Sequence, residues 1–152
     1  MARRRKELSA LAGAAALLGM QGCDSSLEPP TPPLLRDVTA AGGWWDGGCP
    51  PRDATDEILH TGREALSPEL DSRLRQQFPA GSEARRLVQE LRAQGFRATA
   101  PCENDASIHH AEFRQSGGGF AGPYPIFASV AWKEDARGRI AWTKASVSFT
   151  GP

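Results

Sequence analysis

The sequence lacks several features that would point directly to a function. Its longest apolar run, residues 8–20, has 13 residues, fewer than the roughly 20 that a membrane-spanning helix needs. Basic and acidic side chains are equal in number, 18 of each, so there is no positive field to hold nucleic acid. Neither a C-x-x-C pair nor a G-x-S-x-G elbow occurs, which argues against a redox motif and against a serine hydrolase.

Residues 1–22 carry the pattern of a signal peptide. A basic start, residues 3–6, precedes the apolar run of residues 8–20, as in the first two regions of an export signal. The alternative is a buried or amphipathic amino-terminal helix. Apolar side chains would surround that helix on all sides and leave it no charged face, so the pattern favours export.

Cys23 directly follows the apolar run and begins a polar stretch. Gly22-Cys23 resembles the end of a bacterial lipoprotein signal, in which the cysteine is acylated and anchors the chain stably. An ordinary signal cut, which would leave Cys23 as a plain thiol, is the alternative. We predict lipidation of Cys23 and a membrane-anchored protein facing the periplasm, with the choice between inner and outer membrane left open.

Two further cysteines, Cys49 and Cys102, lie 53 positions apart. In an oxidising compartment an even pair is typical of a disulfide. Closing a loop of this length stabilises a fold by about 4 kcal/mol in the chain-entropy treatment. A metal-binding or redox-active pair is the competing interpretation.

Composition divides the remaining chain into three parts. Residues 23–39 contain four prolines before Leu34 and predict a lipidated, flexible, extended tether. Residues 40–66 predict a Gly- and Pro-rich loop followed by a weak helix, and residues 67–152 predict an α+β domain. Trp44 and Trp45 lie in the loop, where they could form an exposed interaction surface or pack onto the domain.

Helical periodicity appears twice in the third part. Ser67 and Pro68 predict a helix start, after which apolar residues recur at four-residue spacing until Pro79. Ser82 is expected to cap a second helix over 83–94, with Gly95 at its carboxyl end. Alternating patterns then predict strands at 96–100, 108–115, 126–133 and 140–149. One face of a three- to four-stranded antiparallel sheet would meet both helices, giving a two-layer α+β domain.

The segment Phe78-Pro79-Ala80-Gly81-Ser82 between the helices, followed by Gly95-Phe96 and the strands, resembles the SmpA/OmlA (BamE-like) group of small bacterial lipoproteins. The resemblance covers about residues 67–151. It implies two helices packed on a three-stranded antiparallel sheet. It also implies a cell-envelope protein that holds protein partners and does not catalyse.

Adjacent His109 and His110 are the sharpest candidates for chemistry. Neighbouring strand residues point to opposite faces, so the two cannot readily share one metal ion. Either could join Cys102, Asp105 or His60, although the sequence has no compact zinc-ligand spacing. Glu103 and Asp105 are expected to be solvated in a polar loop.

These features predict a non-enzymatic envelope lipoprotein that acts as a protein-interaction or structural module, with no cofactor and an unidentified protein partner. The alternative is a periplasmic module that binds a metal or small ligand through His109 or His110. Both interpretations place the domain outside the cytoplasm, and they differ in what the domain binds.

Overall fold

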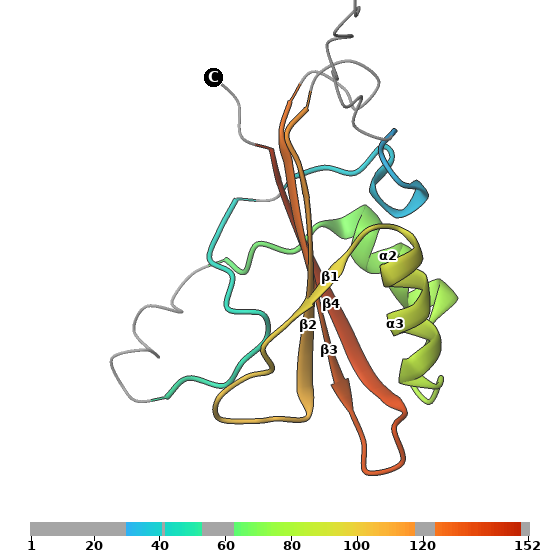
Figure 1. The fold of residues 1–152 in the computed structure, drawn as a ribbon. Helices are drawn as coiled ribbons and strands as arrows, with labels where there is room; N and C mark the ends of the chain where they lie inside the picture. The colour runs from blue at the N-terminus through green and yellow to red at the C-terminus, as the bar shows by residue number, and fades with distance from the viewer. Residues whose placement is uncertain (1–29, 41, 53–62, 118–123, 150–152) are drawn as a thin grey trace, which may run out of the picture.

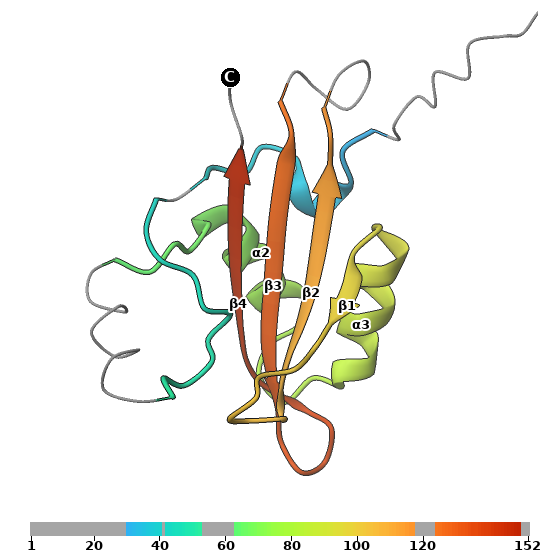
Figure 2. The same ribbon diagram turned by 60° about the vertical axis from the view of Figure 1, so that its left-hand side comes forward.

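The computed structural model describes residues 30–40, 42–52, 63–117 and 124–149. Four antiparallel strands form one sheet in the order β1-β2-β3-β4, which is also their order in the chain. Two helices pack on one face of this sheet (Figures 1 and 2). The predicted α+β class, with helices packed on an antiparallel sheet, is confirmed.

The elements follow the predicted order. A 3-10 turn, η1 (Pro33–Leu35), precedes α2 (Pro68–Gln77) and α3 (Ala84–Ala93). The strands are β1 (Arg97–Thr99), β2 (Ile108–Gln115), β3 (Ile126–Glu134) and β4 (Ile140–Phe149). In the part of the chain that the structure describes, no helix has the length and hydropathy needed to cross a membrane.

The core lies between the helices and the inner face of the sheet. Leu74 and Leu87 are fully buried on the two helices, and Val130 is fully buried on β3. The alternation predicted for β3 therefore places its apolar set on the inner face. The buried core cluster consists of Leu34, Leu35, Val38, Leu70, Leu74, Phe78, Ala84, Leu87, Leu91, Phe96, Ala111, Phe113, Ile126, Ala128, Val130, Trp132, Ile140, Ala145 and Val147.

The carboxyl end of α3 forms as its sequence predicts. Gly95 has a left-handed φ of +87°, which a residue without a Cβ adopts freely. Its N–H donates to Arg92 O at 3.0 Å, and the Phe96 N–H donates to Leu91 O at 2.9 Å. These two bonds satisfy the last helical carbonyls in the Schellman arrangement, and they turn the chain directly into β1.

The two predicted serine caps are wrong in mechanism. Ser67 does precede α2, but its side chain makes no capping hydrogen bond, and its Oγ is buried without a hydrogen-bond partner. Glu83, and not Ser82, occupies the position before α3. The Ser82 carbonyl instead accepts the Ile140 N–H at 2.8 Å, so this residue joins the second helix to the sheet.

The predicted tether over residues 23–39 is too long at its carboxyl end. Leu34, Leu35 and Val38 are buried and belong to the core. Arg73 of α2 fixes this segment, because its guanidinium donates to Leu34 O at 2.9 Å and also to Arg36 O. Burial of three apolar side chains outweighs the extended preference of the preceding prolines.

Within the loop predicted for residues 40–66, the described residues 42–52 lie on the opposite side of the sheet from the helices (Figure 1). The Ala65 N–H donates to Trp44 O at 2.8 Å, and the Trp44 N–H donates to Arg63 O at 3.2 Å. The weak helix expected within this stretch lies mostly outside the described residues. Residues 63–66 are described, and they are not helical.

Candidate functional site

Cys49 and Cys102 form a disulfide, as predicted. It joins residues 42–52, which precede α2, to the loop between β1 and β2. Cys102 is buried and Cys49 is partly buried. The covalent link therefore holds residues 42–52 against the outer face of the sheet, on which Ser129 and Ala131 are also buried.

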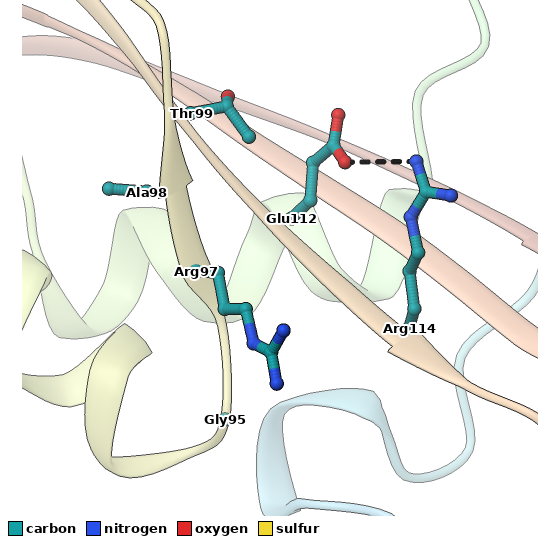
Figure 3. Close-up of a pocket in the computed structure, with 6 residues that line it drawn as sticks. All are labelled: Gly95, Arg97, Ala98, Thr99, Glu112 and Arg114. Atoms are coloured by element: carbon teal, nitrogen blue, oxygen red, sulfur yellow. Dashed lines mark hydrogen bonds and ion pairs between the residues drawn. The ribbon is translucent and has the colours of Figure 1, made fainter.

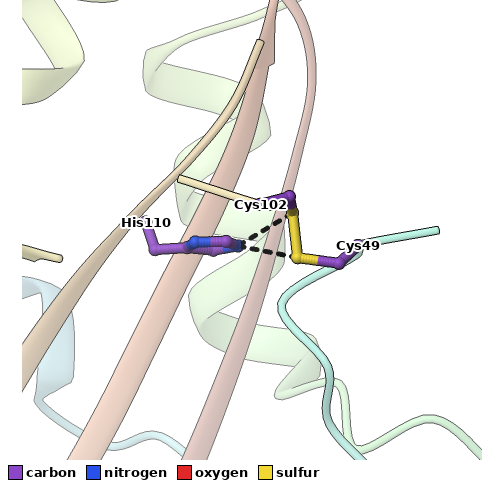
Figure 4. Close-up of side chains that lie close together, drawn as sticks. All are labelled: Cys49, Cys102 and His110. Carbon is purple, nitrogen blue, oxygen red and sulfur yellow. Dashed lines mark hydrogen bonds between the residues drawn. A yellow bond between two sulfur atoms is a disulfide. The ribbon is translucent and has the colours of Figure 1, made fainter. Parts of the chain in front are cut away.

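His110 lies against this disulfide (Figure 4). It projects from β2 on the outer face, because its register partner is Ala131, whereas Ala111 pairs with the core residue Val130. Its Nε2 lies 3.7 Å from the Sγ of Cys49 and 3.7 Å from the Sγ of Cys102. The two sulfurs and this nitrogen form the one group of three or more potential metal ligands found among the described residues.

Two backbone carbonyls hold the His110 ring. Nδ1 lies 3.0 Å from Ala100 O, and Nε2 lies 3.0 Å from Gly47 O. A carbonyl oxygen can only accept, so a neutral ring, which carries one N–H, donates to one of these two carbonyls at a time. The ring therefore lies between the β1–β2 loop, which contains Ala100, and the loop of residues 42–52, which contains Gly47.

Two glycines allow the loop to approach this closely. Gly47 and Gly48 both have left-handed φ angles, +73° and +72°. A Cβ on Gly47 would overlap the His110 ring, and one on Gly48 would overlap the Trp142 ring. Asp46 shapes the turn by accepting the Gly48 N–H at 2.7 Å.

Trp44 and Trp45 are both partly buried. Their loop is fixed by two backbone hydrogen bonds, in which Trp44 donates to Arg63 and accepts from Ala65. This placement gives them neither the full burial of core residues nor the exposure of a free aromatic platform. The predicted interaction role of these two residues remains a prediction.

His109 lies apart from His110, on the inner face of the sheet, as the alternation predicts. Its ring stacks on Trp132 with centroids 5.6 Å apart, and its Nε2 is 3.7 Å from Glu134 Oε1. The structure thus brings His110, and not His109, to Cys102. The other predicted site residues, Cys23 and His60, lie outside the described residues.

Asp105 is not simply solvated, contrary to the expectation for its loop. It accepts hydrogen bonds from Lys133 Nζ at 2.8 Å, from Ser107 N–H at 3.0 Å and from the Ser107 hydroxyl. The Lys133 bond, followed by the Ser107 bonds, lowers the pKa of the carboxyl to about 2. Glu103 does remain exposed, and it lies 3.7 Å from Arg52.

A surface hollow of about 440 Å³ lies beside β1 and β2. Arg97 and Arg114 flank Glu112 there (Figure 3), and Arg114 donates to Glu112 Oε2 at 3.2 Å. Two guanidinium groups beside one carboxylate favour anionic groups. The sequence did not predict this hollow, because only the register of β1 on β2 brings Arg97 opposite Glu112.

No protein-family model matches the chain, and no curated protein or solved structure is significantly similar to it.

We predict that Gly47→Ala destabilises the fold more than Gly138→Ala. Gly138 has nearly the same φ, +70°, but a Cβ there meets no atom within 4 Å. The control should cost about 1–2 kcal/mol for the left-handed backbone alone. Overlap with the His110 ring should add about 1–3 kcal/mol for Gly47→Ala. Urea unfolding of both variants measures the difference, and equal losses would show that the close contact has no energetic weight.

The lowered pKa of Asp105 predicts an acid-dependent loss of stability. A carboxyl whose pKa is lower in the folded chain stabilises it above the unfolded value, near 3.8. This contribution should disappear as the pH falls from about 4 to about 2. Asp105→Asn should therefore be less stable than the wild type at pH 6, and the two should converge toward pH 2.

Urea unfolding between pH 2 and pH 6 checks this expectation, with Glu103→Gln as the matched control in the same loop. The Glu103 side chain is 81% exposed, so its substitution should leave the curve nearly unchanged. A difference between Asp105→Asn and the wild type that stays constant over the whole range would contradict the assignment.

Proposed function

We propose that this chain is an exported lipoprotein, anchored through Cys23, whose domain faces the periplasm and binds a protein partner without catalysing a reaction. The observation that supports export is the disulfide between Cys49 and Cys102. Such bonds form and persist in oxidising compartments and are rare in the cytosol. The basic and apolar start that ends in Gly22-Cys23 supports the same location.

The burial of Leu34 limits how far the domain can stand from its anchor. Ten residues, 24–33, separate Cys23 from Leu34. Fully extended, such a segment reaches at most about 35 Å. A lipid on Cys23 would therefore keep the domain close to the bilayer surface.

One end of the sheet lies nearest to this anchor. The Thr31 hydroxyl hydrogen bonds to Gln115 at the end of β2. Gln115 pairs with Ile126, which pairs with Phe149. The chain therefore enters the domain at the end of the sheet where β3 begins and β4 finishes (Figure 2).

This end also carries two exposed aromatic side chains. Tyr124 is 50% exposed and Phe149 is 40% exposed, and they are the large hydrophobic residues that stand out as exposed among those described. Tyrosine and phenylalanine are enriched at the buried centres of protein interfaces. We assign this end to a protein partner in the same membrane, in keeping with the resemblance to the BamE-like group.

Lipidation is tested by metabolic labelling of cells with radioactive palmitate. The wild-type chain should carry the label and sediment with membranes. Cys23→Ser should lose both properties, because no other residue can accept the diacylglyceryl group in this signal. Cys49→Ser is the matched control and should keep the label; an unlabelled wild-type chain would refute the anchor.

Partner binding is tested by placing a photo-crosslinking phenylalanine analogue at Phe149. It should give one discrete adduct with a membrane protein. The same analogue at Ala136, an exposed residue in the β3–β4 turn at the other end of the sheet, should give none. Adducts with lipid alone, or equal protein adducts from both positions, would contradict the proposed interface.

A further inference from the structure

In the cluster of Cys49, Cys102 and His110, the distances from the ring nitrogen to the two sulfurs match those of a metal site, and the disulfide itself does not require them. Tetrahedral zinc holds sulfur at about 2.3 Å and nitrogen at about 2.05 Å, which places each ligand nitrogen about 3.6 Å from each ligand sulfur. His110 Nε2 lies 3.7 Å from both sulfurs. The nitrogen therefore already has the separation from each sulfur that two ligands of one zinc ion would have (Figure 4).

The other ring nitrogen is held as metal-binding histidines require. Such histidines donate their second N–H to a carboxylate or backbone carbonyl, which fixes the tautomer and the ring orientation. His110 Nδ1 lies 3.0 Å from Ala100 O. A proton on Nδ1 leaves the lone pair on Nε2, which is the nitrogen that faces the sulfurs.

We propose that Cys49, Cys102 and His110 bind a zinc ion when the disulfide is reduced. The two thiolates and the imidazole are ligands that zinc accepts, and Cys2His is a set found in open zinc sites. Three protein ligands leave one position of the tetrahedron for water or another small ligand. This site does not rest on the proposed export or lipidation of the chain.

The redox step balances with a dithiol as the reductant. The dithiol gives two electrons and two protons to the Cys49–Cys102 bond and closes to its own disulfide, leaving two protein thiols. Zinc then displaces both thiol protons to the solvent and forms two Zn–S bonds, and the neutral ring with its proton on Nδ1 supplies the Nε2 lone pair for the Zn–N bond. Each sulfur must move from its bonded position to about 3.8 Å from the other, the separation set by tetrahedral coordination.

Zinc would also take the place of a carbonyl. In the disulfide form, Nε2 lies 3.0 Å from Gly47 O, whereas a zinc ion on Nε2 removes that nitrogen from the Gly47 contact. Cys49, in the same loop as Gly47, becomes a direct ligand. The loop would thus remain attached to the sheet, through the metal instead of the disulfide.

The experiment uses the full chain carrying Cys23→Ser, in detergent, so that Cys49 and Cys102 are the two thiols present. After reduction by a dithiol and its removal under nitrogen, the chain is titrated with cobalt as a spectroscopic substitute for zinc. We expect sulfur-to-cobalt charge-transfer absorption that saturates at one ion per chain. Zinc should bleach it by displacement, and the oxidised chain should give no such absorption.

His109 supplies a matched control for the third ligand. His110→Ala should weaken cobalt binding by about tenfold or more, whereas His109→Ala should leave it unchanged, because its ring lies on the opposite face of the sheet. If reduction unfolds the chain, the two variants become equivalent. Equal affinities in both variants, or no charge-transfer absorption in the reduced parent chain, would overturn the proposal.

Discussion

The covalent link from Cys49 to Cys102 is the constraint on which the outer half of this structure depends. The helices cover only the inner face of the sheet, and residues 42–52 cover part of the other face. Apart from the partly buried Trp44 and Trp45, that loop has few apolar side chains to bury, and it contains glycines that lose much backbone entropy on ordering. Joining it to the β1–β2 loop lowers the entropy of the unfolded chain by the equivalent of about 4 kcal/mol, which offsets the cost of ordering this segment.

Local sequence patterns predicted the two helices and their ends well, because these features depend on residues close together in the chain. The apolar spacing of Leu70, Leu74 and Phe78, the stop at Pro79 and the left-handed Gly95 depend on neighbours within one or two helical turns. They located both helices within one or two residues. The predicted tether was wrong at Leu34 and Leu35 because their partners, on α2 and the inner sheet face, are distant in sequence. Asp71 shows the same limit, since an acid in the first turn of a helix is ordinarily exposed, yet here burial raises its pKa.

The candidate site was only half predictable for a related reason. An even pair of cysteines predicts a disulfide, and the alternation of β2 separates His109 from His110. Nothing in the spacing distinguishes which histidine meets the sulfurs, because that depends on which sheet face the 42–52 loop covers. The carbonyls of Gly47 and Ala100 that hold the ring leave no signal in side-chain patterns. Gly47 and Gly48 are the sequence feature that comes nearest to indicating this contact, since a pair of glycines before a cysteine allows a close backbone approach.

The two cysteines that form the structural disulfide are also two of the three proposed zinc ligands, so one chain cannot hold the disulfide and the metal at the same time. A sulfur in a disulfide is not a thiolate and so does not bind zinc as one. When His110 Nε2 carries a proton and donates to Gly47 O, it has no lone pair for a metal. Oxidation therefore excludes zinc, and zinc binding opposes oxidation, as linkage requires for two states that use one set of atoms. In an oxidising compartment the disulfide is the expected state. Cys49 is the more exposed of the two cysteines, so a reductant has its easier access there, and with zinc present the loop would exchange one attachment to the sheet for another.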